Sequence, residues 1–256
     1  MQRSSTFTLA VPPAKALAAI TSASVLLMAC GANPTSPELS QDLHAELEFA
    51  VTELATLTTI EVDVTVHSDE PGAFTDLSTI SVEVRLEGET EWEATELAPH
   101  EDHFSAEMMF FSSGEYEARV TAQVTGSTDV LTLYQTTERL HVERIHQEVG
   151  DYIVEFETLP GHLLEGQIAE VTFWVLEASA DAHAHGHAVG GLAPDIACTD
   201  ANGMVEEHAA HEHEAGEYGA EHTLLEAGTA HFELHFTDAM GVDRHAEFSA
   251  PVSHEH

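Results

Sequence analysis

The amino-acid sequence predicts an all-β protein of two tandem immunoglobulin-like antiparallel β-sandwich domains, which follow a signal peptide and a short tether. Three observations lead to this prediction. Apolar and polar residues alternate through most of the chain, the second half repeats the pattern of the first, and the first thirty residues have the composition of an export signal. Helical periodicity is weak except over residues 38–54, where we expect a short helix or an irregular lead-in.

The predicted signal peptide spans residues 1–29. It is positively charged through Arg3 and Lys15, and an apolar stretch follows over residues 16–29. This stretch is too short and too interrupted to remain in the membrane as a helix. It ends in the sequence LMAC, which resembles the bacterial lipobox, so we predict cleavage before Cys30 and lipidation of its thiol. The alternative is an ordinary signal peptide beside a chance cysteine.

Lipid on Cys30 implies a membrane partner. Each acyl methylene that enters the bilayer contributes about 0.8 kcal/mol, so several chains on one cysteine anchor a protein stably. Residues 30–45 are predicted to form a tether that begins with small residues and prolines. No aspartate follows the cysteine directly, which favours the outer membrane of a two-membrane bacterium. We therefore expect a lipid-anchored protein of the cell envelope, which faces the periplasm or lies at the cell surface.

The predicted mature chain is strongly acidic. The full sequence has a formal net charge of −39, and loss of Arg3 and Lys15 with the signal peptide leaves five arginines against 46 acids, a charge of −41. Such a surface repels nucleic acid and anionic lipid, so neither is expected as a partner. The acids are spread along the chain, which favours adaptation to a saline habitat, as in a halophilic cell, over one cation-binding surface.

The alternation places the first sandwich at residues 46–147. Residues 59–66 put four apolar side chains on one face of a predicted strand, and residues 80–86 repeat this pattern. Further alternating runs lie at residues 116–124, 130–134 and 140–142. Because Cys30 is assigned to lipid, Cys198 has no intramolecular partner, and packed cores rather than a disulfide must stabilise the fold.

The second sandwich, residues 151–253, repeats the first. Residues 104–114 align without gaps on residues 218–228, and both segments combine an aromatic residue, an Ala-Glu step and a closing glycine. In this alignment His222 stands where the first copy has Met108. Each copy has about 100 residues with regularly spaced strands, which is the size of an immunoglobulin-like sandwich. We expect the join near residues 147–151.

These motifs resemble the YtkA-like (FixH-related) domain. The resemblance covers residues 57–126 and, with an insertion, residues 165–241, and it rests on the aromatic-x-Ala-Glu step, the apolar pair and the small-residue turn with glycine. It implies an extracytoplasmic bacterial β-sandwich, often in a lipoprotein and often near metal or respiratory systems. It implies no catalytic residues.

Histidine is concentrated in the second domain, because 13 of the 19 histidines follow residue 150. The first copy shows what the scaffold needs, so the added histidines require another explanation. They gather in an insertion at 181–187 and in an acidic tract at 206–214. Side chains two residues apart on an extended strand start about 6.6 Å apart, so an HxH pair can bind one ion. The candidate metal ligands are His183, His185, His187, His208, His211, His213 and His222.

The chemistry of these residues favours Zn²⁺ or Cu²⁺, because neutral imidazole and carboxylate are common ligands of both ions. Methionine clusters of the kind that bind Cu⁺ are missing, since Met108-Met109 is the single adjacent pair. Cys198 could be a soft ligand, but its strand-like context favours buried packing. The alternative for the histidine tracts is a solvated polar loop of low complexity. That alternative is favoured for the C-terminal pair of His254 and His256.

We expect no enzyme, because the sequence lacks a nucleophile elbow, a phosphate-binding glycine loop and an HExxH motif. The first hypothesis is a membrane-anchored lipoprotein that buffers or delivers Zn or Cu through its second domain. The second is a structural or protein-interaction module of a salt-adapted cell envelope, with incidental histidines and an envelope protein as partner.

Overall fold

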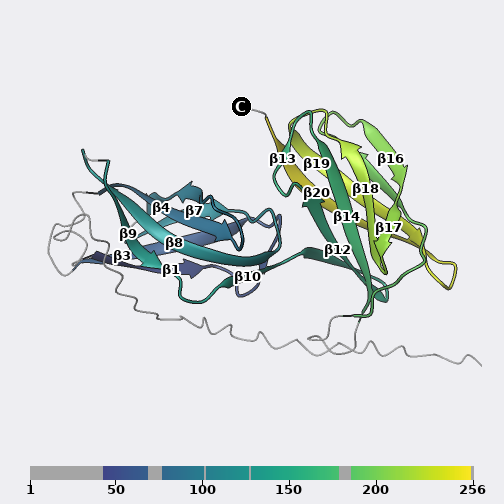
Figure 1. Cartoon of the computed structure of the whole chain (residues 1–256), viewed down its shortest axis with the longest axis horizontal. Coiled ribbons are helices and arrows are strands. Elements are labelled where there is room, and N and C mark those ends of the chain that lie inside the picture. The colour runs from purple at the N-terminus through teal and green to yellow at the C-terminus, as the bar shows by residue number, and fades with distance from the viewer. Residues whose placement is uncertain (1–42, 69–76, 101, 127, 179–185, 255–256) are drawn as a thin grey trace, which may run out of the picture.

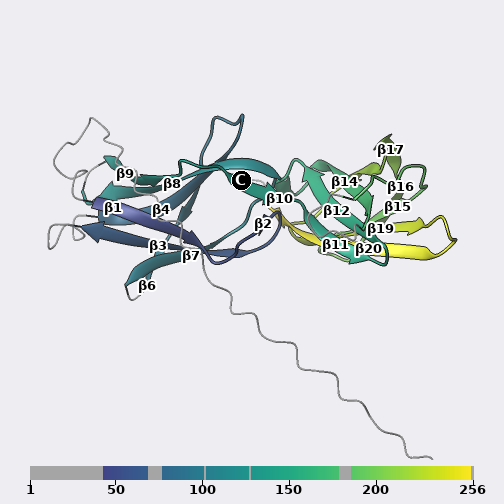
Figure 2. The ribbon, with the colours of Figure 1, turned by 90° about the horizontal axis from the view of Figure 1, so that it is seen from below.

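The computed structural model describes residues 43–68, 77–100, 102–126, 128–178 and 186–254. It confirms the all-β class, with two sandwiches placed one after the other along the long axis (Figures 1 and 2). The predicted signal peptide, Cys30 and the tether up to residue 42 lie outside the described residues. Within the described part, no helix is long and apolar enough to pass through a bilayer.

The first sandwich consists of a four-stranded and a six-stranded sheet. The four-stranded sheet has the order β1 (Leu43–Phe49), β3 (Ile60–Ser68), β7 (His103–Met108), β6 (Ala98–His100). The other sheet has the order β2 (Leu54–Ala55), β10 (Leu140–Glu143), β8 (Gly114–Val124), β4 (Leu77–Leu86), β5 (Glu93–Glu96), and β9 (Val130–Gln135) also pairs with β8.

The second sandwich has two five-stranded sheets. One has the order β11 (Ile145–Val149), β12 (Tyr152–Leu159), β14 (Ile168–Glu177), β18 (Glu217–Thr223), β17 (His211–Glu214). The other has the order β13 (Leu163–Leu164), β20 (Asp243–Ser253), β19 (Gly228–Thr237), β15 (Asp195–Thr199), β16 (Val205–Ala209). The order β2-β10-β8-β4-β5 thus recurs as β13-β20-β19-β15-β16, and the short first strand is parallel to its neighbour in both copies. The internal repeat is therefore a repeat of topology.

Strand β1 replaces the helix or irregular lead-in that we expected within residues 38–54. It pairs with β3 from Leu43 to Phe49, and its alternate residues Leu43 and Ala45 are buried. The period of two in this segment prevails because each apolar side chain reaches the core when the segment extends. The strand starts inside the stretch that we had assigned to the tether.

Each sandwich has its own core, made by the inward residues of both sheets. Val62 and Val64 of β3 are fully buried in the first, and Val171 and Phe173 of β14 hold corresponding places in the second. Full burial of one such side chain stabilises the fold by roughly 1.5–3 kcal/mol. The aromatic ring of Phe156 contacts three other phenylalanine rings in the second core.

The two sandwiches meet at Arg144, which is the single residue between β10 and β11. Its guanidinium lies 3.8 Å from the ring centroid of Trp174 and donates to Glu155 and Glu157. Glu157 also accepts hydrogen bonds from the backbone N–H and the hydroxyl of Ser113 in the first sandwich. The change of sheet therefore lies at residue 144, slightly before the expected join, and both these polar contacts and the packing of Leu57 against the second core join the two domains.

Candidate metal centre

One side of the second sandwich is closed by polar rather than apolar side chains. β16 is the edge strand of its sheet, and its residues Glu206 and His208 pair in register with the buried Cys198 and Ile196 of β15. Residues paired across an antiparallel ladder share one face, so the side chains of Glu206 and His208 point to the interior. Both are half-buried.

The opposite wall of this corner is β18, which belongs to the other sheet. Its residue His222 is 1% exposed and pairs with Ala169 of β14. The edge-to-face contact between the rings of His222 and His208, with centroids 4.9 Å apart, joins the two sheets.

Glu206, His208 and His222 bring one ligand atom each to within 4.8 Å of one another. The Oε1 of Glu206 lies 3.0 Å from the Nε2 of His208, and its Oε2 lies 3.8 Å from the Nδ1 of His222. The backbone N–H of Thr223 donates to the same Oε2 over 3.1 Å, which fixes the carboxylate. Within the described ranges, no other group of three or more His, Cys, Asp or Glu side chains has ligand atoms this close.

The protonation states suit a cation. Burial lowers the pKa of His222 to about 4, with the neighbouring His208 adding to the effect, so the imidazole is neutral at pH 7. The hydrogen bond from the backbone of Thr223 is the main reason why the pKa of Glu206 lies below its usual value, and contact with His208 adds to it. The corner therefore offers a neutral imidazole and an ionised carboxylate.

Unsatisfied polar atoms are concentrated here. Of the six buried side-chain nitrogen and oxygen atoms without a hydrogen-bond partner in the described residues, three lie in this corner, and a fourth, the Oδ2 of Asp200, lies in the adjoining pocket wall. The three are both ring nitrogens of His222 and the Nε2 of His208, which lies 3.0 Å from the Oε1 of Glu206 without hydrogen-bond geometry. Buried polar atoms in native proteins nearly always have partners, and each one left without a partner costs about 1–3 kcal/mol. An arrangement this costly requires a compensating role.

The first sandwich has neither histidine at the matching positions. The pairings of β4 with β8 and of β15 with β19, together with the repeat alignment, match Val84 to Cys198. The pairings with the edge strands β5 and β16 then match Thr95 to His208 and Glu93 to Glu206. Met108 is buried where His222 lies. The scaffold thus accommodates an apolar side chain at this place, and the histidines are an addition.

The other predicted ligands that the structure describes, His187, His211 and His213, do not join this cluster. His183 and His185 lie outside the described residues, and His187 is exposed. His211 and His213 are exposed on β17, and His213 lies over Gly219 beside Glu170, 3.3 Å from its carboxylate, on the outer face of its sheet. Of the seven sequence-predicted ligands, the structure brings together His208 and His222.

Glu206 was missed as a ligand by the sequence reasoning, although it belongs to the acidic tract that we singled out. It stands two residues before His208, so the same alternation that turns one inward turns both inward. The HxH rule gave weight to the histidine pair on β17 instead. An ExH pair on an edge strand was the signal available.

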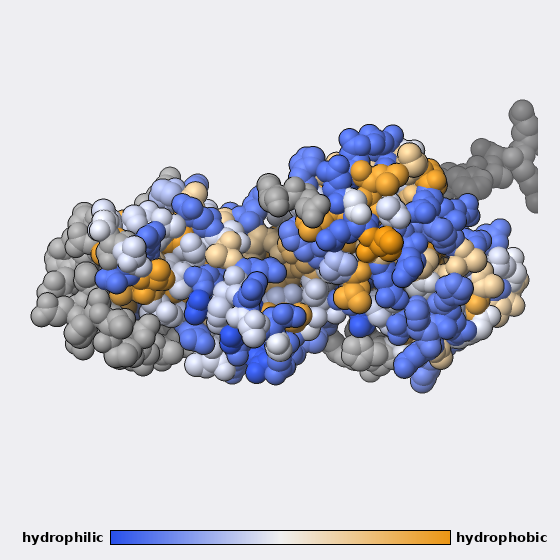
Figure 3. Space-filling view, turned by 45° about the horizontal axis from the view of Figure 1, so that its top comes forward, coloured by the Kyte–Doolittle hydropathy of each residue, from blue (hydrophilic) through white to orange (hydrophobic). Residues whose placement is uncertain are grey.

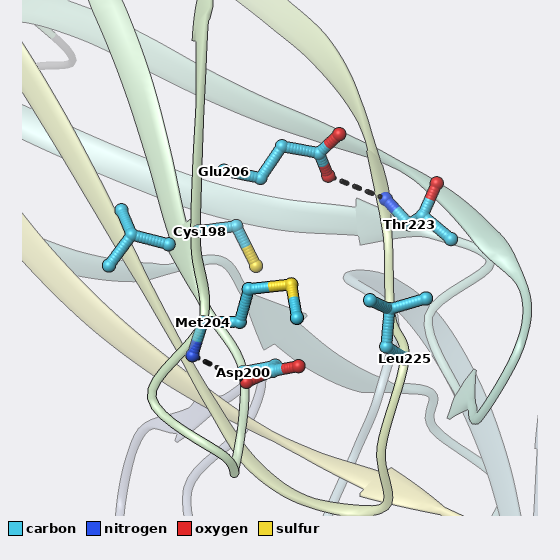
Figure 4. Close-up of a pocket in the computed structure, with 7 residues that line it drawn as sticks. Cys198, Asp200, Met204, Glu206, Thr223 and Leu225 are labelled. Atoms are coloured by element: carbon cyan, nitrogen blue, oxygen red, sulfur yellow. Dashed lines mark hydrogen bonds between the residues drawn. The ribbon is translucent and has the colours of Figure 1, made fainter.

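A pocket of about 200 Å³ adjoins the cluster and shares Glu206 with it (Figure 4). Cys198, Asp200, Met204, Val205, Thr223 and Leu225 line the rest of its wall. Burial raises the pKa of the Cys198 thiol to about 12, and the nearby charges of Glu206 and Asp200 act in the same direction. The side chains of Met204, Val205 and Leu225 are exposed at its rim.

No family model matches this sequence, and no curated protein matches it. Among solved structures, the chain is similar to a tetra-tandem repeat in the extending region of a large adhesion protein, with 13% identity, a TM-score of 0.30, and coverage of 82% of this chain and 49% of that one. It is also similar to fibronectin(III)-like modules of CbhA from Clostridium thermocellum, with 14% identity, a TM-score of 0.25, and coverage of 82% and 97%.

A third similar structure is the Escherichia coli adhesin FdeC, with 16% identity, a TM-score of 0.28, and coverage of 81% of this chain and 63% of the adhesin. The chain spans about half the length of the adhesion-protein repeat. Likeness at these values does not carry function from one protein to another, so the fold assignment rests on the strand order and the functional argument on the site.

Proposed function

We propose that this chain is a lipid-anchored extracytoplasmic protein whose second domain binds a divalent transition metal through Glu206, His208 and His222. The observation that carries the proposal is His222, a buried imidazole with no hydrogen-bond partner on either nitrogen among the residues that the structure describes. The lipobox-like sequence before Cys30 and the resemblance to YtkA-like domains support the extracytoplasmic address.

Two imidazoles and one carboxylate form a ligand set that Zn²⁺ and Cu²⁺ both accept. Three protein ligands leave at least one position of the ion open. An ion with an open position can be passed to another ligand set, which fits buffering or delivery. The acidic surface, with 46 carboxylates in the chain, raises the local concentration of cations around the site.

A purely structural explanation accounts for part of the corner. Inward-pointing charged residues on an edge strand prevent that edge from pairing with another chain, and Glu206 and His208 on β16 could serve this purpose. That explanation does not cover His222, which lies on β18, a strand between β14 and β17, and is buried opposite Ala169 of β14. The first sandwich has a methionine there and folds with the same strand order.

The metal proposal is tested by calorimetric titration of the chain without its signal peptide, with Zn²⁺ and Cu²⁺ at pH 7.5. We expect one tight equivalent that His208→Thr removes, because threonine is the residue that the first sandwich carries at this place. His254→Ala is the matched control, since His254 contacts Glu165 far along the chain from the cluster, and it should bind as the unchanged protein does. Binding that His208→Thr leaves intact would refute the site and favour the interaction-module hypothesis.

The anchoring proposal is tested by cell fractionation. We expect Cys30→Ala to release the protein from the membrane fraction into the soluble periplasm or the medium, because the lipid has no other attachment point in the proposal. Membrane association unchanged by this substitution would contradict it.

A further inference from the structure

The turn between β15 and β16 forms one wall of the pocket beside the histidine cluster. The Oδ1 of Asp200 accepts hydrogen bonds from the backbone N–H groups of Asn202 and Met204, which fixes the turn. The Oδ2 of the same carboxylate is buried and has no hydrogen-bond partner within the described part of the chain, and Asp200 as a whole is 7% exposed. Figure 4 shows this carboxylate turned into the pocket. An unpaired buried oxygen at a pocket wall indicates a missing cation or donor.

Two sulfur atoms face the same pocket. The Sγ of Cys198 and the Sδ of Met204 are turned toward each other between Asp200 and Glu206 (Figure 4). Methionine at an exposed rim is unusual when burial is available, and here it brings a thioether over a buried thiol. In the first sandwich the place of Cys198 is taken by Val84, so the scaffold does not need sulfur there.

We propose that this pocket is a second site, which binds the soft monovalent cation Cu⁺ through Cys198 and Met204, with the buried carboxylate of Asp200 in the pocket wall. Thiolate and thioether sulfur select Cu⁺ over harder ions. The inference deepens the proposed function and rests on it for the role of the domain, because Glu206 borders both sites. It narrows the proposed metal from Zn or Cu to copper. The domain would bind Cu⁺ in the pocket and Cu²⁺ in the histidine cluster.

Binding at this site exchanges one proton for one ion. The S–H bond of Cys198 breaks, the proton goes to solvent, and a sulfur–copper bond forms, while Met204 donates a lone pair without losing an atom. No electron is transferred, so the step needs no oxidant or reductant. The position at the pocket rim lets the ion enter and leave without opening the core.

The test is competition for Cu⁺ under argon between the chain and the chromophoric chelator bicinchoninate, with the ion supplied as its acetonitrile complex. We expect Met204→Leu and Cys198→Val each to weaken Cu⁺ binding by about 100-fold or more, beyond the roughly 10–100-fold that loss of an outer-shell partner costs. Valine is the residue that the first sandwich carries at the position of Cys198. Cys198→Ser is a second variant, which removes the sulfur but retains a polar side chain. Met240→Leu is the matched control, because Met240 is an exposed methionine outside both sites, and it should keep Cu⁺ affinity within about threefold.

The outcomes separate the two proposals. If Cu⁺ binding survives both sulfur substitutions, the pocket is not the site and this inference is overturned. If His222→Met abolishes Cu⁺ binding while Cys198→Val does not, Cu⁺ uses the histidine cluster, so this inference fails and the proposed function stands. If the sulfur variants lose Cu⁺ while the unchanged chain binds neither Zn²⁺ nor Cu²⁺, the proposed divalent site fails and the sulfur site is supported.

Discussion

Met108 and His222 occupy the same place in the two sandwiches, on corresponding strands that face the core. Around Met108 the partner strand offers Ile60, and around His222 it offers Ala169. The first sandwich fills the space with apolar contacts, whereas the second contains an imidazole without hydrogen bonds. The two sandwiches therefore share one scaffold. The first is packed for stability at this position, and the second is less stable at this corner.

The difference shows how a binding site can be added to a repeat without a change of topology. Three positions on three strands differ in chemistry, namely those of Cys198, His208 and His222, while Glu206 keeps the acid that the first sandwich has in Glu93. Natural sites commonly carry such a local cost in stability, which the ligand offsets when it binds. The predictions below exchange residues between the two sandwiches, measure the cost in stability, or test the histidines of β17 beside the site.

The largest effect is expected from building the metal site into the first sandwich. Thr95→His together with Met108→His should give the first sandwich two histidines beside Glu93, and the chain should then bind a second equivalent of Zn²⁺. Calorimetric stoichiometry measures this, with circular dichroism to show that the first sandwich remains folded. A folded double variant that still binds one equivalent would show that the repeat positions are not equivalent in geometry.

The second effect is a pH dependence that belongs to His222. Its pKa is lowered to about 4 in the folded chain from 6.5, so the unfolded state takes up a proton first as the pH falls. Protonation of this group does not affect the free energy of unfolding above about pH 6.5. Between about pH 6.5 and pH 4 it lowers the free energy of unfolding, by about 3 kcal/mol in total. Urea unfolding of the metal-free chain and of His222→Met across this range isolates the contribution. Parallel curves for the two proteins would disprove the assignment.

The third prediction is a change in the free energy of unfolding that has opposite signs in the two sandwiches. Without metal at pH 7.5, His222→Met should raise the free energy of unfolding by about 1–3 kcal/mol, because it removes buried nitrogens that have no partners. Met108→His should lower it by a similar amount in the first sandwich. Chemical denaturation measures both. If His222→Met destabilises the metal-free chain, the imidazole has a packing role that outweighs its unsatisfied atoms.

The smallest effect is expected on β17. The double substitution of His211 and His213 by alanine should change Zn²⁺ affinity by less than about threefold, because both side chains are exposed and His213 lies on the outer face of its sheet. Titration beside the unchanged chain measures this. A loss of Zn²⁺ affinity as large as that expected for His208→Thr would show that His211 and His213 are ligands, as the sequence pattern favoured.

Much of the fold follows from local pattern. Period two places Val62 and Val64 in the core because a strand has no other way to bury every second side chain, and the repeat alignment already set His222 against Met108. Which histidines meet depends on tertiary structure. His208 and His213 are equally plausible ligands in the sequence, but the sandwich turns one toward β18 and the other outward. The approach of β16 to β18 is a contact between sheets, and no local spacing encodes it.

The central claim is that the two imidazoles of His208 and His222 and the carboxylate of Glu206 bind one ion together. X-ray absorption of the Zn²⁺-loaded chain tests it most directly. The account predicts two imidazole nitrogens at about 2.0–2.1 Å with one carboxylate oxygen at about 2.0–2.2 Å, and the loss of one imidazole in His222→Met. A first shell of oxygen alone, or a spectrum that His222→Met leaves unchanged, would contradict it.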